Sequence, residues 1–276
     1  MSKKVIPLWT LYGLKQGKAT VPWPAGERDS QEGFLGMPRF DPQKCQDGCR
    51  DCVDACLPGA ITLESAGEAR LNVDYGRCVV CQMCVEACPT GAFTASGDWA
   101  FGVRRRKDLV WSRATASDDG TALQSEIRRV FGRSLHIRHV DAGSCNGCES
   151  ELQALGNPLY NLHRLGIFFT PSPRFADLLL VTGPVTYALR EPLHAAYEAM
   201  PEPRFVMAVG TCAVSGGTNG GGYSCGNGLE GVLPVDLYLP GCPPNPAAII
   251  HALLMLVQRM TQRVHGGRIV EGDDRA

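Results

Sequence analysis

Eight of the thirteen cysteines in this 276-residue chain lie between residues 45 and 88, in two sets of four. The first set is Cys45, Cys49, Cys52 and Cys56, and the second is Cys78, Cys81, Cys84 and Cys88. The two sets form an internal repeat, because three cysteines and a Gly-Ala pair of one align with those of the other at an offset of 32 residues. Four thiolates in such a short segment are typical of a site that holds a 4Fe–4S cubane.

The spacing of the second set, C-x2-C-x2-C-x3-C followed by Pro89, is that of bacterial two-cluster ferredoxins, whose fourth cysteine binds the other cluster. The first set has one extra residue between Cys45 and Cys49, where Gly48 is free to adopt an unusual dihedral angle. We therefore expect both clusters to form, the first in altered surroundings. Exchange of the fourth cysteine predicts one cluster on Cys45, Cys49, Cys52 and Cys88 and another on Cys78, Cys81, Cys84 and Cys56. The alternative is a pair of zinc sites, but zinc ligands usually come as two separated pairs.

Four further cysteines follow predicted strands in the second half of the chain. They are Cys145 and Cys148 after residues 135–140, Cys212 after 205–210 and Cys242 after 235–240. The carboxyl ends of parallel strands share one edge of an open α/β sheet, so these thiolates can converge on one site. A redox dithiol of the thioredoxin type is the alternative for the Cys-Asn-Gly-Cys pair.

The remaining cysteine, Cys225, lies in the glycine-rich stretch 220–228, and we expect it to be a free thiol. That stretch does not form the G-x-G-x-x-G fingerprint of dinucleotide sites. The histidines show no ligand spacing, and we interpret all six as structural or surface residues: His136, His139, His163, His194, His251 and His265.

The elements that must position these residues fall into two modules. We predict an extended N-terminal arm (1–40), an α+β ferredoxin-like module (41–97), a linker (98–134) and an α/β domain (135–276). The short first module has little core, so its clusters would also stabilise its fold. In the α/β domain, the buried-strand pattern of 176–183 and the helices expected at 191–200 and 246–260 predict a doubly wound, flavodoxin-like parallel sheet.

The linker contains a predicted helix at 122–130 and the basic run RRRK at 104–107. We interpret this run as a solvated face, with docking to a partner or to anionic lipid as the alternative.

Composition narrows the function further. The net charge is −1 and 44% of residues are hydrophobic, which argues against nucleic-acid binding and against disorder. No signal-peptide pattern is visible, and the apolar stretch 247–257 is too short to span a bilayer. We expect a cytoplasmic protein, whose reducing surroundings favour metal ligation over disulfides.

Seven stretches of the second half carry a resemblance to a known family. They are 131–135 (FGRSL), 141–149 (DAGSCNGCE), 157–161 (NPLYN), 181–185 (VTGPV), 199–203 (AMPEP), 208–213 (AVGTCA) and 240–246 (PGCPPNP). Together they resemble the small, cluster-bearing subunit of membrane-bound nickel–iron hydrogenases of the formate-hydrogenlyase type, which is related to the 20-kDa subunit of complex I. The resemblance implies that Cys145, Cys148, Cys212 and Cys242 hold the 4Fe–4S cluster nearest the catalytic subunit.

Residues 14–24 (LKQGKATVPWP) and 33–38 (GFLGMP), with the eight cysteines, resemble the ferredoxin-like subunit of the same complexes, which is usually a separate chain. Complex I has two adjacent cysteines where this chain has Cys145 and Cys148, so the resemblance favours hydrogenase over quinone chemistry. The chain lacks the paired CxxC motifs of a nickel site, which places the nickel–iron centre on another subunit.

The resemblance thus implies an oxidoreductase subunit that relays electrons through three 4Fe–4S clusters to or from a hydrogenase-like large subunit. Its other partners would be membrane subunits and an electron-donor or acceptor module, on the cytoplasmic face of the inner membrane. The alternative is the equivalent subunit of a quinone- or ferredoxin-linked complex without hydrogenase activity. Glu151 is a candidate for proton transfer or a helix N-terminal carboxylate, and Glu149 could take either role.

Overall fold

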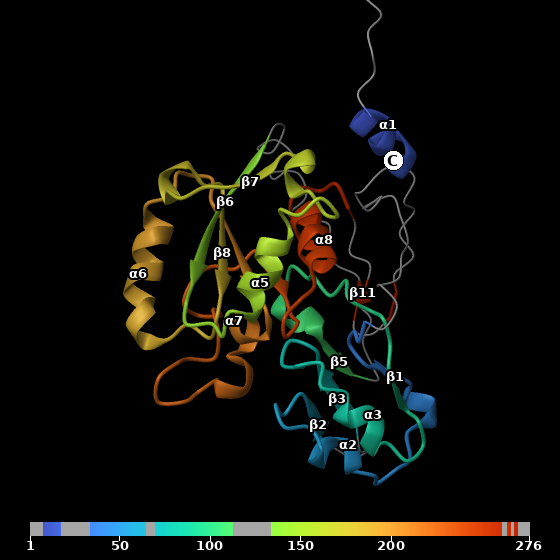
Figure 1. Ribbon diagram of the computed structural model, residues 1–276. Helices are drawn as coiled ribbons and strands as arrows, with labels where there is room; N and C mark the ends of the chain where they lie inside the picture. Colours follow the sequence, from blue (N-terminus) through green and yellow to red (C-terminus); the bar gives the residue numbers. More distant parts are fainter. Residues whose placement is uncertain are drawn as a thin grey trace, which may run out of the picture.

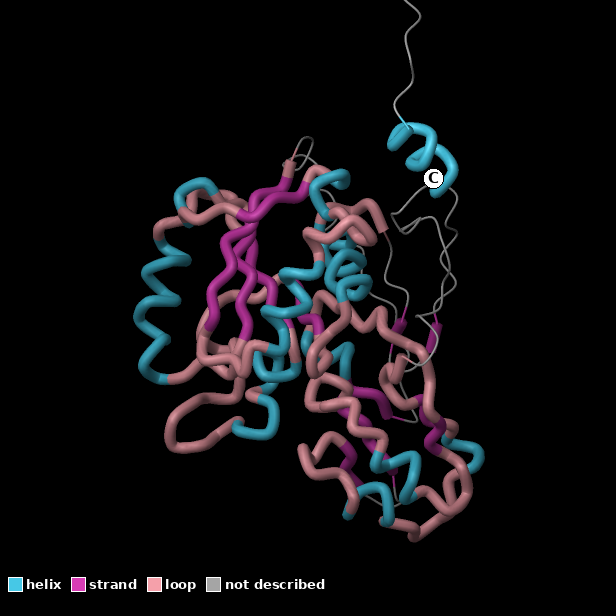
Figure 2. The backbone as a smooth tube through the Cα atoms, viewed as in Figure 1, coloured by secondary structure: helices cyan, strands magenta, loops and turns pink. Residues whose placement is uncertain are grey.

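The computed structural model describes residues 8–17, 34–64, 70–112, 134–260, 264–265 and 268–269. Apart from helix α1 (Leu8–Gln16) and the terminal pair β11 (Val264–His265) and β12 (Arg268–Ile269), the described elements form two parts. Figures 1 and 2 show an N-terminal part, within 34–112, that lies below and beside a larger C-terminal part, within 134–260.

The N-terminal part contains small antiparallel sheets and short helices. Strand β3 (Arg70–Asp74) pairs with β2 (Ile61–Glu64) on one side and with β5 (Val110–Ser112) on the other. Strand β1 (Arg39–Phe40) pairs with β4 (Phe93–Thr94) in a separate sheet, and this pairing is antiparallel like the two pairings of β3. The helical turns are η1 (Pro42–Lys44), α2 (Asp51–Asp54), α3 (Met83–Ala87) and η2 (Arg106–Leu109). Strand β5 lies in the segment that was predicted as a linker, so this segment completes the ferredoxin-like sheet.

Residues 8–16 differ from the extended arm predicted for 1–40, because they form helix α1. Its leucines, Lys15 and Gln16 are good helix formers, and the prolines that suggested an extended arm, Pro22 and Pro24, lie outside the described residues. No residue of α1 is buried. The helix predicted at 122–130 also lies outside the described residues.

The C-terminal part is built on a parallel sheet with the strand order β10-β9-β8-β6-β7. The strands are β6 (Leu135–Asp141), β7 (Ile167–Phe169), β8 (Leu178–Thr182), β9 (Phe205–Val209) and β10 (Leu237–Leu239). Every neighbouring pair is parallel. In chain order the strands read 2-1-3-4-5, which is the flavodoxin arrangement and confirms the predicted doubly wound fold. All five residues of β8 are buried, as expected for a central strand covered on both faces.

Helices cover both faces of this sheet. Figure 1 shows α6 (Tyr187–Glu198) on one face and α5 (Gly147–Ala154) with α8 (Pro246–Leu256) on the other. Helix α7 (Thr211–Ser215) lies at the carboxyl edge, near the N-terminal part. Helix α6 begins four residues before the predicted start, so Pro192 lies inside it rather than in its first turn. The helical turns η3 (Leu162–Leu165), η4 (Pro173–Phe175) and η5 (Gly217–Asn219) complete the domain. Among the described residues, no helix is long and apolar enough to cross a membrane.

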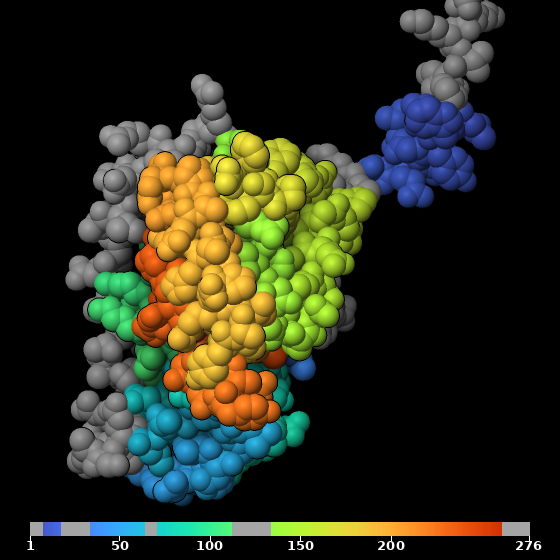
Figure 3. Space-filling view, turned by 90° about the vertical axis from the view of Figure 1, so that its left-hand side faces the viewer, coloured from blue at the N-terminus to red at the C-terminus, as the bar shows by residue number. Residues whose placement is uncertain are grey.

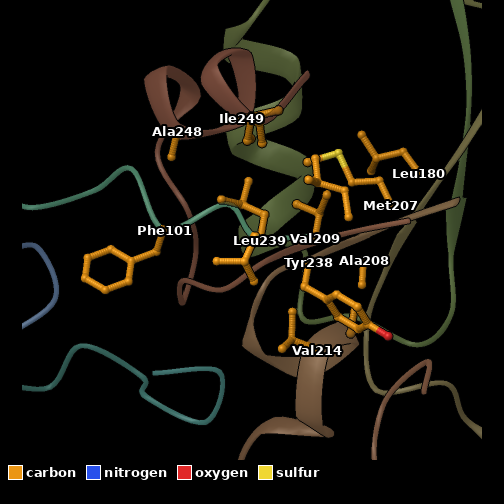
Figure 4. Packing of buried hydrophobic residues seen from close by; sticks show 14 of the residues in the cluster. Phe101, Leu180, Met207, Ala208, Val209, Val214, Tyr238, Leu239, Ala248 and Ile249 are labelled. Atoms are coloured by element: carbon orange, nitrogen blue, oxygen red, sulfur yellow. The ribbon is translucent and has the colours of Figure 1, made fainter. Parts of the chain in front are cut away.

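Helix α8 is buried along almost its whole length because the two parts of the molecule enclose it. The Asn245 side chain accepts a 2.7 Å hydrogen bond from the amide of Ala248 and caps the helix, and Pro246 occupies its first turn. Trp99 packs edge-on against His251, with ring centroids 5.9 Å apart. Figure 4 shows Phe101, from the N-terminal part, next to the strand and helix that carry Leu239 and Ala248.

One backbone bridge joins the two parts directly. Val103 and Tyr238 exchange hydrogen bonds of 2.9 and 2.8 Å, which places residue 103 beside strand β10. The buried hydrophobic residues of both parts form one cluster. The space-filling view in Figure 3 shows the N-terminal residues in blue and teal packed directly beneath the orange residues of the C-terminal part. The two modules are therefore fixed to each other by a common core.

The basic run 104–107 was predicted as a solvated face, and for Arg104 and Arg106 this prediction was wrong. Arg104 Nη2 donates a 2.8 Å hydrogen bond to the Met255 carbonyl at the end of α8. Arg106 binds both carboxylate oxygens of Asp74 at 2.8 and 2.7 Å, in a pair whose side chains are only 15% and 21% exposed. Arg104 therefore links the two parts, whereas Arg106 and Asp74 form a bidentate ion pair within the N-terminal part.

Candidate metal centres

The first group of thiols surrounds Cys52, which lies inside helix α2. Its neighbours are Cys45, Cys49 and Cys88, and all four line one recess with about 280 Å³ of empty space. Burial and, after it, the charges of the surrounding thiols raise the pKa of Cys52 to about 11. Gly48, with φ at +78°, turns the chain within the extra-residue loop between Cys45 and Cys49. The structure thus brings together the four cysteines that were predicted for the first cluster, and we call them the first site.

The second group, on helix α3 and the loop before it, consists of Cys56, Cys78, Cys81 and Cys84. Burial raises the pKa of Cys84 most, and the charges of Cys78, Cys56 and Cys81 also raise it, to about 12 in all. The pKa of Cys78 rises to about 12 for the same reason, although the amide of Val80 opposes it with a 3.4 Å hydrogen bond to the sulfur. Cys56 therefore lies with the cysteines of the other half of the repeat, and we call this group the second site.

The Gly-Ala pair shared by both halves of the repeat has a structural role beside the sulfurs. Ala60 donates its amide to Cys56 Sγ at 3.2 Å, and Ala92 donates to Cys88 Sγ at the same distance. The glycines before them have φ angles of +62° and +65°, a conformation that residues with a Cβ rarely adopt. Each glycine therefore turns the next amide towards the cysteine that joins the opposite site.

The third group lies at the carboxyl edge of the parallel sheet. Cys148 has Cys212, Cys242 and Cys145 as its thiol neighbours, and burial raises its pKa strongly. The four residues follow β6, β9 and β10, as the strand pattern predicted: Cys145 and Cys242 lie in loops, Cys148 lies in the first turn of α5 and Cys212 in α7. Cys145 and Cys242 are exposed, so this third site opens onto the surface of the chain.

The turn from β9 into α7 passes directly against the third site. Gly210 has a φ angle of +87°, and a Cβ at this residue would lie 2.5 Å from the sulfur of Cys148. Only a glycine lets the backbone approach the thiol so closely.

The acid beside the third site that carries the hydrogen bonds is Glu149. Its carboxylate accepts a 2.7 Å bond from the Ser144 hydroxyl and a short one from the Thr182 hydroxyl. His139 Nε2 lies 3.0 Å from the same Thr182 oxygen and 3.5 Å from Glu149. Because the Thr182 hydroxyl donates its proton to the Glu149 carboxylate, the imidazole of His139 is the donor in its hydrogen bond with Thr182.

Sequence reasoning placed His139 among the structural or surface residues and did not connect it with Glu149. The missed signal is the register of the adjacent parallel strands β6 and β8, in which His139 pairs with Leu180 and Asp141 with Thr182, so that residues 139 and 182 are offset by two positions. Glu151, the other candidate acid, is half-buried on α5, and burial raises its pKa.

Cys225 is buried, and its thiol donates a 3.0 Å hydrogen bond to the carbonyl of Asn219. Its charge contributes to the raised pKa of Cys212, after burial and the other thiols, so it lies near the third site. The free thiol predicted for a flexible loop is in fact an enclosed residue beside a candidate ligand.

The donor chemistry of the three sites fits iron–sulfur cubanes. Among the described residues, no three histidine, cysteine, aspartate or glutamate side chains are arranged to hold a single metal ion. In a tetrahedral site every thiolate lies about 2.3 Å from one ion. In a cubane each thiolate binds a different iron, and the thiolates can lie farther apart. The four-thiol groups, with amides directed at Cys56, Cys78 and Cys88, offer this donor set.

Comparisons with known proteins agree with this division of the chain. Residues 145–256 match the family model described as NADH ubiquinone oxidoreductase, 20 Kd subunit, and residues 41–92 match that of the 4Fe-4S dicluster domain. The probable membrane-bound hydrogenase subunit mbhJ of Pyrococcus furiosus is 38% identical over 142 residues, which cover 51% of this chain and 85% of that protein. The chain belongs to the family of the complex I 20-kDa subunit.

This chain carries the 20-kDa-type match and the dicluster match in one polypeptide. Formate hydrogenlyase subunit 7 of Escherichia coli is 38% identical over 151 residues. The match covers 55% of this chain and 59% of that relative. A chain of the membrane-bound sulfane sulfur reductase, an archaeal respiratory membrane complex, is 35% identical, with 48% of this chain and 72% of that one covered at a TM-score of 0.42. The protein is an iron–sulfur subunit of the hydrogenase and complex I family of oxidoreductases.

Proposed function

We propose that this chain is the iron–sulfur electron-transfer subunit of a membrane-associated nickel–iron hydrogenase complex of the formate-hydrogenlyase type. It carries three 4Fe–4S clusters and relays electrons to or from a catalytic large subunit. The observation that carries the proposal is the gathering of twelve thiols into three groups of four, on two parts of the chain that share one hydrophobic core.

The ligands we propose are the four cysteines of each site. Cys45, Cys49, Cys52 and Cys88 hold the first cluster, Cys56, Cys78, Cys81 and Cys84 hold the second, and Cys145, Cys148, Cys212 and Cys242 hold the third. Each cluster, when bound, supplies one-electron transfer at a potential that sulfur hydrogen bonds, charge and exposure adjust. The chain's own contribution is to hold the sulfurs, to direct amides at them and to exclude water from the buried cysteines.

The exposure of the third site supports its place next to a partner. Cys145 and Cys242 are exposed in this chain, and a large subunit that covers them would bring its metal centre close to the third cluster. The Cys-Asn-Gly-Cys spacing and the similarity to two relatives, a probable membrane-bound hydrogenase subunit and a formate hydrogenlyase subunit, favour a nickel–iron partner. Membrane subunits and a donor or acceptor module complete the complex, at the cytoplasmic face of the inner membrane.

Anaerobic purification of the intact complex, followed by metal and sulfide analysis, tests the proposal. We expect about twelve irons and twelve acid-labile sulfides for this chain, at four of each per cubane, after the partner chains are separated from it. We also expect nickel in the large subunit and hydrogen uptake with an artificial electron acceptor. Clearly fewer irons would overturn the three-cluster assignment. A complex with twelve irons but neither nickel nor hydrogen uptake would instead establish the quinone- or ferredoxin-linked alternative.

A further inference from the structure

Thr211 lies between two of the candidate sites and has the ligand-bearing loops of both within hydrogen-bond reach. Its hydroxyl is almost fully buried, with the residue 1% exposed. The Oγ1 atom donates a 2.8 Å hydrogen bond to the carbonyl of Cys78, in the second site. The same oxygen accepts a 3.2 Å hydrogen bond from the amide of Gly241, which directly precedes Cys242.

The rest of Thr211 is equally constrained. Its amide donates a 2.9 Å hydrogen bond to the Gly241 carbonyl, and its carbonyl accepts a 3.0 Å bond from the Ser215 hydroxyl. The next residue in the chain is Cys212, a third-site thiol. One side chain therefore connects the loop of Cys78 with helix α7, which carries Cys212, and with the loop that carries Cys242.

We propose that Thr211 is a positioning residue that fixes the spacing between the second and third 4Fe–4S sites. The inference rests on the proposed function for the presence of the clusters, but the hydrogen bonds belong to this chain alone. A hydroxyl suits the position because it donates to one backbone group and accepts from another at the same time. A methyl group would leave the half-buried Cys78 carbonyl and the buried Gly241 amide without that partner, which is costly inside a protein.

The position also matters for the two modules as wholes. Cys78 belongs to the N-terminal part and Gly241 to the C-terminal part, so the Thr211 hydroxyl crosses the seam between them at the point where their sites come together. The Val103–Tyr238 bridge and the Arg104–Met255 hydrogen bond, which also link the two parts, involve no candidate ligand.

Three full-length variants separate the hydroxyl from the general packing of α7. Thr211→Val replaces the hydroxyl by a methyl group of similar size, and Thr211→Ser keeps the hydroxyl. Ser215→Ala is the matched control, because it removes another buried hydroxyl of α7 whose hydrogen bond goes to a backbone carbonyl of the same helix.

The first measurement is amide hydrogen exchange at Gly241 in the anaerobically purified protein. We expect exchange in Thr211→Val to be roughly fivefold faster than in the wild type, the factor that corresponds to a hydrogen bond worth about 1 kcal/mol. Thr211→Ser and Ser215→Ala should retain the wild-type rate. An unchanged rate in Thr211→Val would overturn the proposal whether or not clusters are bound.

The second measurement is the magnetic interaction between the two reduced clusters, recorded by electron paramagnetic resonance together with iron content. We expect the interaction to weaken or broaden in Thr211→Val and to match the wild type in the other two variants. Loss of iron from Thr211→Val with full retention in Thr211→Ser would support the same role. Equal iron and an unchanged interaction in Thr211→Val would overturn it. A wild-type protein with clearly fewer than about twelve irons would contradict the proposed function instead.

Discussion

At the level of single residues, Cys56 and Cys88 show how each half of the repeat contributes one cysteine to the site of the other half. Each accepts an amide hydrogen bond from the alanine four residues later, and each lies with the thiols of the opposite half. Hydrogen bonds to sulfur adjust cluster potentials, so these two alanine amides are matched features of the first and second sites. The repeat conserves the turn as well as the thiols, and the extra residue after Cys45 leaves this turn unchanged.

Cys225 and Cys212 provide a direct test of the third site, because the two thiols lie near each other and only one is a proposed ligand. We expect Cys225→Ser to retain about twelve irons, since its thiol already has the Asn219 carbonyl as its hydrogen-bond acceptor. Cys212→Ser should lose about four irons. Iron analysis of both variants checks this, and a loss of iron from Cys225→Ser would show that the third site is wrongly assigned.

The eight candidate ligands of the first and second sites could be predicted from the sequence because their spacing is a local pattern. The four of the third site were predicted from the strands that they follow and from the family resemblance. The hydrogen-bond network of Glu149 could not be predicted, because Thr182 and His139 are 43 positions apart and meet only through the register of β6 and β8. Thr211 was inside a recognised stretch, 208–213, but its contact with Cys78 spans 133 positions. Local patterns carry no information about such pairs.

At the level of elements, the turns after the parallel strands decide whether thiols can gather. The turn between β9 and α7 needs Gly210, whose positive φ and close approach to Cys148 exclude any Cβ. Gly231 also has a positive φ, of +77°, but a Cβ there would meet nothing within 4 Å. Both glycines therefore have a positive φ, but only at Gly210 would a Cβ clash with a neighbouring sulfur.

We expect Gly210→Ala to displace the Cys148 sulfur and to leave a protein with about eight irons, four fewer than the wild type. Gly231→Ala should retain about twelve irons, although the positive φ would cost it of order 1–3 kcal/mol of stability. Iron analysis and thermal unfolding distinguish the two effects. Retention of all the iron in Gly210→Ala would mean that Cys148 is not held where the turn places it.

The strands of the sheet were predicted well and the seam between the modules was not. Residues 135–140, 176–183, 205–210 and 235–240 were recognised because buried parallel strands are nearly continuous apolar runs, and they correspond to β6, β8, β9 and β10. Residues 99–112 carry no such pattern. Their role as part of the ferredoxin-like sheet and of the seam depends on partners far along the chain, Tyr238 and Met255 among them.

For the molecule as a whole, the common core predicts that the two parts unfold together. Trp99 packs across the seam against His251, whereas Trp111 packs within the N-terminal part against Phe40, with ring centroids 5.0 Å apart. Both tryptophans are buried.

We expect a single thermal transition for the anaerobic protein with its clusters bound. Trp99→Ala and Trp111→Ala should each lower the midpoint of that same transition, since truncation of a buried tryptophan costs about 3–5 kcal/mol. Scanning calorimetry checks this. Two separate transitions, with Trp111→Ala moving only one of them, would show that the parts unfold independently.

The Val103–Tyr238 bridge and the enclosed helix α8 also determine whether the two parts stay in contact when the protein is diluted. Two proteins that exchange electrons as separate chains dissociate when their concentration falls below their dissociation constant. Here both partners share one polypeptide and one core, so their effective concentration is set by the chain itself and does not depend on how much protein is present. Contact between the dicluster domain and the 20-kDa-type domain should therefore persist at any dilution, and assembly with a large subunit needs one encounter in place of two.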